Sequence, residues 1–161
     1  MTAGKYLVYV TIISIFAVFI SGAYLSGSGF GAACGVGGTS LSSNDWPYCN
    51  GSLSFPSYWP AQVEYMHRLL SVFATGLLVG SNLAVWVMKP RPTAAARALL
   101  LALGLLLLEV YLGGVVINAN LNVVIGTISL ATATMVFGVL VIAGDRMYLH
   151  EKGSSLGSAE N

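Results

Sequence analysis

Long hydrophobic runs, separated by polar segments, dominate this sequence. A helix needs about 20 residues to cross the hydrocarbon layer of a bilayer. The pattern predicts four membrane-spanning helices, at Tyr6–Leu25, Val63–Met88, Ala98–Ile117 and Leu121–Ala143. The first run follows Lys5 and could be mistaken for a secretory signal, but it is too long and no small-residue cleavage site follows it. We therefore expect it to be retained as a helix.

Polar residues interrupt the pattern at the start of the second run, in the segment Glu64-Tyr65-Met66-His67-Arg68. Residues three and four apart are neighbours on a helix, so Glu64, His67 and Arg68 are predicted to share one face. The same face continues to Ser71 and Thr75. A polar stripe is thus expected to descend into an otherwise apolar helix.

Composition supports a membrane protein. Hydrophobic residues make up 56% of the chain, charged residues only 8%, and the mean hydropathy is +0.78. Ordinary soluble domains are about one quarter charged. We predict an all-α membrane protein, a bundle of four transmembrane helices with an ordered loop between the first two. Residues 1–144 would form one transmembrane domain with an outer cap at 26–62, and residues 145–161 a polar tail.

The basic residues lie near the N-terminus, between the second and third runs, or after the fourth. Apart from Arg68 at the start of the second run, they are Lys5, Lys89, Arg91, Arg97, Arg146 and Lys152. Because cytoplasmic loops are enriched in Lys and Arg, both termini are predicted to be cytoplasmic and the 26–62 loop extracytoplasmic, in a multi-pass protein of the cell membrane. No outer basic surface interleaved with aromatic residues is present, which argues against nucleic acid as a partner.

The 26–62 loop is the longest stretch predicted to be non-helical. Its aromatic residues argue against disorder and its prolines against helix; they are Trp46, Tyr48, Phe55, Tyr58 and Trp59, and Pro47, Pro56 and Pro60. Both cysteines, Cys34 and Cys49, lie here. On the oxidising side of a membrane they predict a structural disulfide worth about 3 kcal/mol. A redox-active pair is the alternative, although the spacing is not C-x-x-C.

Glu109 lies within the third run, where a carboxylate costs about 2.5–3.5 kcal/mol, so it should face the bundle and either have a partner or be protonated. That partner could be a cofactor or a neighbouring helix. At 1.5 Å per residue, Glu109 would lie roughly 12 Å and His67 roughly 6 Å from the outer helix ends. The turn Asn118–Asn122 is short, so the third and fourth helices should be antiparallel neighbours.

Three motifs occur in the order Gly22–Cys34, Asp45–Gly51 and Glu64–Arg68. Together they resemble the haem A synthase family. The resemblance implies an enzyme that oxidises a methyl group of haem O to a formyl group, giving haem A for terminal oxidases. Family members usually have eight helices in two related halves, and this chain resembles one half, as in compact members.

The resemblance also assigns roles to individual residues. It implies that Glu64 is the catalytic carboxylate, that His67 is an axial ligand of haem iron, and that the loop cysteines form a disulfide. From its own chemistry, Arg68 could pair with a haem propionate. The alternative is that these are interfacial groups extending to water. Glu109 and Ser129 complete the predicted cofactor-binding residues, and the cofactor is haem, as haem b or as the substrate haem O.

The sequence departs from the family pattern at three places. Residues Gly35–Asn44 are inserted between the cysteines, Ser26 stands where an arginine is common, and Ser129 stands where the family has a second axial histidine. Half the usual number of helices predicts a homo-oligomer, with contacts at Gly113-Gly114 or at Gly22–Gly29. Other expected partners are membrane lipid and a haem O synthase or oxidase assembly protein.

Two other functions fit parts of the pattern. A four-helix thiol-quinone oxidoreductase would use Cys34 and Cys49. A non-catalytic membrane haem-binding subunit would use His67 without needing Glu64.

Overall fold

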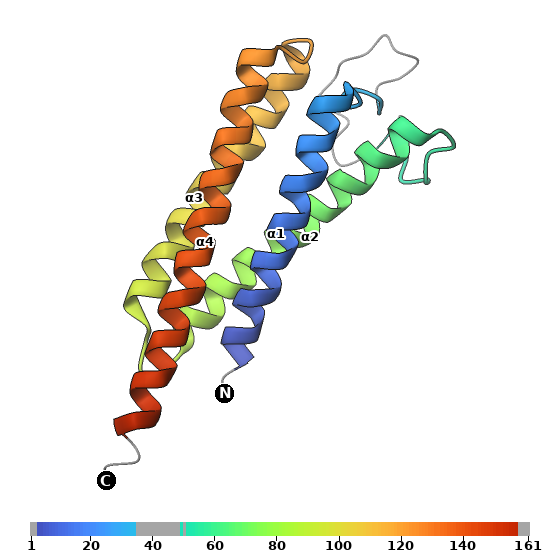
Figure 1. Cartoon of the computed structure of the whole chain (residues 1–161). Helices are drawn as coiled ribbons and strands as arrows, with labels where there is room; N and C mark the ends of the chain where they lie inside the picture. The colour runs from blue at the N-terminus through green and yellow to red at the C-terminus, as the bar shows by residue number, and fades with distance from the viewer. Residues whose placement is uncertain (1–2, 35–48, 50, 158–161) are drawn as a thin grey trace.

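A computed structural model of the chain describes residues 3–34, 49 and 51–157 (Figure 1). These residues form four helices and no strand: α1 (Ala3–Ser28), α2 (Trp59–Val87), α3 (Thr93–Asn118) and α4 (Val123–Gly157). Each helix is long and apolar enough to cross a membrane. The predicted all-α, four-helix membrane fold is confirmed.

The helices are longer than predicted at several ends. Pro60, which we took as evidence against helix, lies in the first turn of α2, where a missing backbone N–H breaks no helical hydrogen bond. Helix α4 starts after Asn122, whose side-chain oxygen accepts hydrogen bonds from the backbone N–H groups of Val124 and Ile125 at 3.0 and 3.3 Å. It runs on to Gly157, so residues 145–157 of the predicted polar tail are helical.

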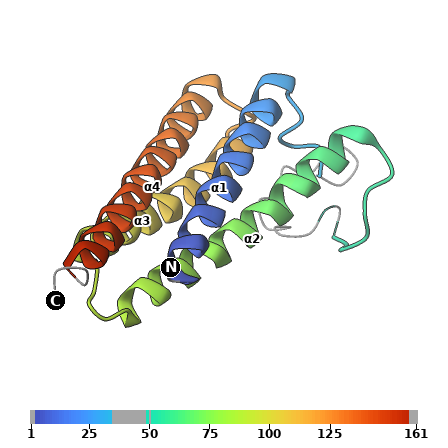
Figure 2. The same cartoon turned by 60° about the horizontal axis from the view of Figure 1, so that its bottom comes forward.

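The four helices form a ring in which each packs against its two neighbours. Contacts join α1 to α2, α2 to α3, α3 to α4 and α4 to α1. The ends of the chain and the α2–α3 turn lie at one end of the bundle, and the α3–α4 turn and the loop after α1 lie at the other (Figures 1 and 2). We call these the terminal end and the cap end.

The main apolar core lies in the half of the bundle nearer the terminal end. All four helices contribute to it, with Val8, Ile15, Ala74, Leu78, Val85, Leu99, Val136, Leu140 and Met147 among its members. Polar groups join helices inside it: Thr11 and Ser81 share a hydrogen bond of 2.8 Å between α1 and α2, and Asn82 donates to Leu99 O of α3 at 3.3 Å. This half is therefore closed by the chain itself.

Toward the cap end the chain buries less of itself. On α3 the last buried residue is Leu106, and on α4 the first within the described ranges is Thr132. Helix α2 diverges from α3 in this direction (Figure 1), and its outer part packs instead on a second cluster of Cys34, Cys49, Ala61 and Tyr65. We call this cluster and the loop residues around it the cap.

The cap is described only in part. Its buried cluster confirms packing at the ends of the loop. The predicted insertion Gly35–Asn44, and with it Trp46, Pro47 and Tyr48, lies outside the described residues.

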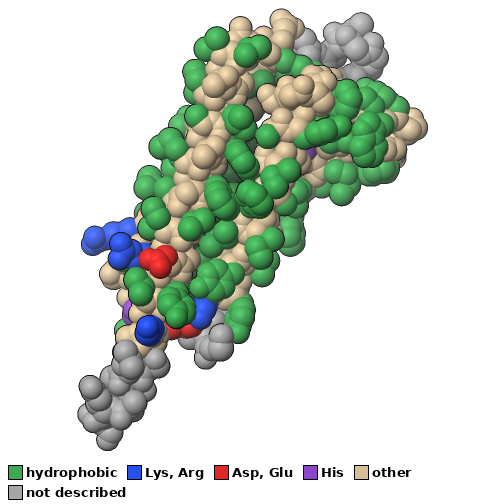
Figure 3. Space-filling view, in the orientation of Figure 1, with side chains coloured by type: hydrophobic (Ala, Val, Ile, Leu, Met, Phe, Trp, Pro, Cys, Tyr) green, Lys and Arg blue, Asp and Glu red, His purple; other side chains and the backbone are tan. Residues whose placement is uncertain are grey.

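The lateral surface is apolar, as a lipid-facing surface must be. In Figure 3, hydrophobic side chains cover most of the visible face, and Lys, Arg, Asp and Glu gather near the terminal end. There Lys5 forms an ion pair with Glu151 at 3.0 Å, and His150 Nε2 lies 3.2 Å from Pro90 O. These contacts hold the N-terminus and the α2–α3 turn against the last turns of α4.

Candidate functional site

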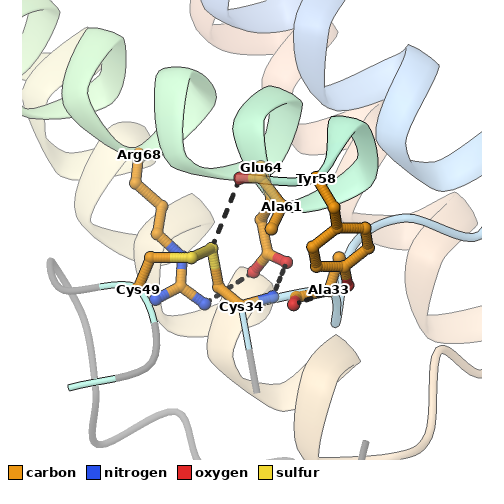
Figure 4. A network of polar contacts seen from close by, with 7 residues as sticks. All are labelled: Ala33, Cys34, Cys49, Tyr58, Ala61, Glu64 and Arg68. Carbon is orange, nitrogen blue, oxygen red and sulfur yellow. Dashed lines mark hydrogen bonds and ion pairs between the residues drawn. A yellow bond between two sulfur atoms is a disulfide. The ribbon is translucent and has the colours of Figure 1, made fainter. Parts of the chain in front are cut away.

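Glu64 and Arg68 form a buried ion pair on the cap side of α2 (Figure 4). Arg68 Nη2 donates to Glu64 Oε1 at 2.6 Å, and the backbone N–H of Cys34 donates to Glu64 Oε2 at 2.7 Å. The Glu64 side chain is only 3% exposed and the Arg68 side chain 8%. Helical spacing predicted a shared face for Glu64 and Arg68, but sequence reasoning missed both their ion pair and the Cys34 amide. One carboxylate oxygen thus bonds within α2, and the other ties α2 to the cap.

The predicted disulfide between Cys34 and Cys49 is present, and both residues are buried. Tyr65 of α2 and Tyr58, which immediately precedes α2, hold the cap residues around the disulfide in place. Tyr58 donates its hydroxyl proton to Ala33 O at 3.0 Å, and Tyr65 donates to Leu53 O at 2.7 Å. Burial and this surrounding network favour the structural interpretation of the disulfide over the redox-active one.

His67 does not join the Glu64–Arg68 pair but points to α1. Its Nδ1 lies 2.8 Å from Ser21 Oγ. The next residue, Gly22, lies beneath the ring, since a β-carbon at position 22 would be 3.1 Å from His67 Cε1. Because successive helical residues are turned by roughly 100°, His67 and Arg68 flank Glu64 on opposite sides. The predicted polar face is therefore split between α1 and the cap.

A wide apolar groove of about 510 Å³ runs beside His67. Helix α2 supplies most of its wall, Ser21 comes from α1 and Phe55 from the cap, and the other main apolar members are Trp59, Met66 and Phe73. An imidazole at the edge of an apolar groove suits a large, flat, mainly apolar molecule with one coordination position to offer. This arrangement fits a haem, because imidazole is a common axial ligand of its iron.

The structure brings Glu109 and Ser129 together across α3 and α4. Ser129 donates its hydroxyl proton to Glu109 Oε1 at 2.6 Å. The other oxygen, Oε2, is buried and has no hydrogen-bond partner in the part of the chain described. Neither residue is hydrogen-bonded to His67. Glu109 thus has a partner on a neighbouring helix, as expected. It makes no hydrogen bond to His67.

The described residues contain no group of three or more His, Cys, Asp or Glu side chains able to hold a bare metal ion. The sequence has two histidines, and His150 lies at the terminal end against Pro90. His67 is accordingly the histidine at the groove. The geometry offers one imidazole with a carboxylate and a guanidinium within one helical turn of it.

Comparison with protein families gives one match of wide extent. The family described as cytochrome oxidase assembly protein, COX15-CtaA, matches residues 2–141 of the 161-residue chain. The comparison with curated proteins found no significant match, and neither did the comparison with solved structures. The family match covers all of α1, α2 and α3 and the larger part of α4. The chain is a multi-pass membrane protein and belongs to the COX15-CtaA family of cytochrome oxidase assembly proteins, the haem A synthase family.

Proposed function

We propose that this protein is a haem A synthase that oxidises a methyl group of haem O to a formyl group. The observation that carries the proposal is the placement of His67. Its imidazole is anchored through Nδ1, lines an apolar groove and lies one helical turn from a buried carboxylate. Because the chain belongs to an oxidase assembly family, this set of groups supports an enzyme that acts on haem more than it supports a general membrane carrier.

Each polar residue of the site has a role in the proposal. His67 would hold the haem iron, and haem, when bound, would supply the iron chemistry. Glu64 is the catalytic carboxylate: each of its oxygens makes one hydrogen bond and keeps a second lone pair that can accept a proton. Arg68 holds Glu64 in place. Glu109 and Ser129 are proposed to bind the cofactor from α3 and α4, where Oε2 of Glu109 is still unpaired among the described residues.

The proposal extends to surroundings and partners. Basic residues gathered at the terminal end support cytoplasmic termini and an extracytoplasmic cap. The outer parts of α3 and α4 bury few side chains, which supports a second copy of this chain as a neighbour in the membrane. Haem O is the substrate, lipid surrounds the helices, and a haem O synthase or an oxidase assembly protein would deliver or receive the haem.

Co-expression with a haem O synthase in cells that lack haem A tests the proposal. Haem extracted from the membranes and separated by chromatography should contain haem A. The His67→Ala variant should yield none, while the His150→Gln variant should match the wild type because His150 lies at the terminal end. Haem O that accumulates unchanged with correctly inserted wild-type protein would contradict the proposal.

The two other functions make different predictions. A haem-binding subunit needs His67 but not Glu64, so a Glu64→Gln protein that binds haem and supports oxidase assembly fully would favour that function. A thiol-quinone oxidoreductase needs its cysteines to react, and the disulfide is buried here. Haem A formation that survives replacement of both cysteines by serine would eliminate that mechanism.

A further inference from the structure

The hydroxyl group of Ser21 determines which nitrogen of His67 carries the proton. Ser21 Oγ lies 2.9 Å from Val18 O of its own helix and 2.8 Å from His67 Nδ1. A hydroxyl has one proton to donate, and a carbonyl oxygen has none, so it can act only as an acceptor. If Ser21 donated to His67, two oxygens would face each other at 2.9 Å with no proton between them. Ser21 therefore donates to Val18 O and accepts from His67.

This arrangement places the imidazole proton on Nδ1. A neutral imidazole carries one proton, so Nε2 keeps its lone pair. Among the described residues, His67 Nε2 has no hydrogen-bond partner. Gly22 leaves room for the ring, because a β-carbon there would lie 3.8 Å from Nε2 as well as 3.1 Å from Cε1. The ring is fixed on α1 by one nitrogen, and the other nitrogen makes no hydrogen bond to the described residues.

Metal-binding histidines commonly donate their second N–H to an oxygen, which fixes both the tautomer and the orientation of the ring. We propose that Ser21 is a positioning residue of this site, which holds His67 as the Nδ1–H tautomer so that Nε2 can bind haem iron. The inference rests on the proposed function for its iron, but the tautomer itself is a property of the protein without haem. Ser21 acts through His67 and need not touch the haem.

The helix offers a matched control in Ser71. Its hydroxyl also belongs to the His67 neighbourhood, but it donates to the backbone oxygen of His67 at 2.8 Å, whereas Nδ1 of the ring is hydrogen-bonded to Ser21. Replacing Ser71 removes one hydroxyl from α2, one turn after His67, without changing the hydrogen-bond partner of His67 Nδ1. A general effect of polarity would appear in both serine variants, whereas the proposed effect appears only at Ser21.

The first experiment measures the tautomer in the full-length, haem-free protein in lipid nanodiscs. Selective ¹⁵N labelling of histidine gives signals from two imidazoles, and the His150→Gln variant leaves His67 alone. We expect a protonated Nδ1 and an unprotonated Nε2 in the wild type and in Ser71→Ala. Ser21→Ala should show a mixture of tautomers, and Ser21→Thr should restore the wild-type pattern. A protonated Nε2 in the wild type, or an unchanged Ser21→Ala spectrum, would overturn the proposal.

The second experiment measures haem binding by titration and absorption spectroscopy. Loss of an outer partner of a metal-binding histidine typically weakens affinity 10- to 100-fold, so Ser21→Ala should lose about that much and Ser71→Ala little. Equal affinities in the two variants would overturn the role of Ser21 toward iron. If His67→Ala left the haem spectrum unchanged, the assignment of His67 as ligand would fail, and that failure would be distinct from the tautomer result.

Discussion

Replacing Glu64 by Gln should loosen the cap and expose the disulfide to reductant. In the wild type, one carboxylate oxygen accepts from Arg68 and the other from the Cys34 amide. Glutamine has a single acceptor oxygen, so it can keep one of these bonds but not both. Because Cys34 and Cys49 are only 1% and 2% exposed, a thiol reagent can reach them only when the cap opens.

The expected size of the effect follows from the bond that is lost. A hydrogen bond to a charged group contributes about 1.5–3 kcal/mol. If cap opening costs that much less free energy, the open population rises roughly 10- to 150-fold, since about 1.4 kcal/mol is a factor of ten. Reduction that proceeds through the open state should accelerate by the same factor.

The assay follows disulfide reduction in detergent-solubilised protein by dithiothreitol. Samples are quenched with an alkylating reagent at intervals, and mass spectrometry counts the alkylated cysteines. Glu109→Gln is the matched control, because it makes the same chemical change on α3, where the partner is Ser129 and not the cap. Equal reduction rates for the wild type and Glu64→Gln would refute the idea that Glu64 secures the cap.

Three further predictions follow from close packing and topology. Gly22→Ala should push the His67 ring off α1, since the added β-carbon would lie 3.1 Å from Cε1; weaker haem retention in spectrophotometric titration would show this. Gly144→Ala should destabilise the α1–α4 contact by about 1 kcal/mol in denaturant titration, because its β-carbon would lie 2.9 Å from Ile12 Cδ1 and 3.3 Å from Tyr9 Cε1. Gly138→Ala, which meets no atom within 4 Å, is the control for both variants and should be neutral or stabilising. A green fluorescent protein fused to the C-terminus should fluoresce, and alkaline phosphatase at the same position should be inactive, if the terminal end is cytoplasmic.

The long apolar runs were sufficient to predict the helices, because a membrane span needs about 20 apolar residues. They were insufficient at the ends, where specific contacts decide. The tail after Asp145 is polar in sequence, yet Met147 is buried in the core and Glu151 pairs with Lys5, more than a hundred residues earlier in the chain. These two contacts anchor the last turns of α4. Such long-range partners cannot be read from local composition.

The candidate site could also be predicted only in part from the sequence. The shared face of Glu64 and Arg68 follows from helical spacing, although their ion pair was not predicted, and the cysteine pair follows from its location in an outer loop. Ser21 carried no signal, since a serine within an apolar helix usually bonds its own backbone, as Ser21 also does with Val18 O. The Cys34 amide was equally invisible, because a backbone donor has no sequence signature.

The position of the site follows from how the chain distributes its packing. The apolar core closes the terminal half, and the disulfide-linked cap covers the outer part of α2. Between these two supports, His67 lies on α2 beside the apolar groove, which α1, α2 and the cap line. Two fixed ends can hold the His67 side chain in place without filling the groove beside it. A bundle packed uniformly along its length would hold the same residues more tightly but would leave a bulky substrate no room, so incomplete burial in this region is consistent with binding a molecule as large as a haem.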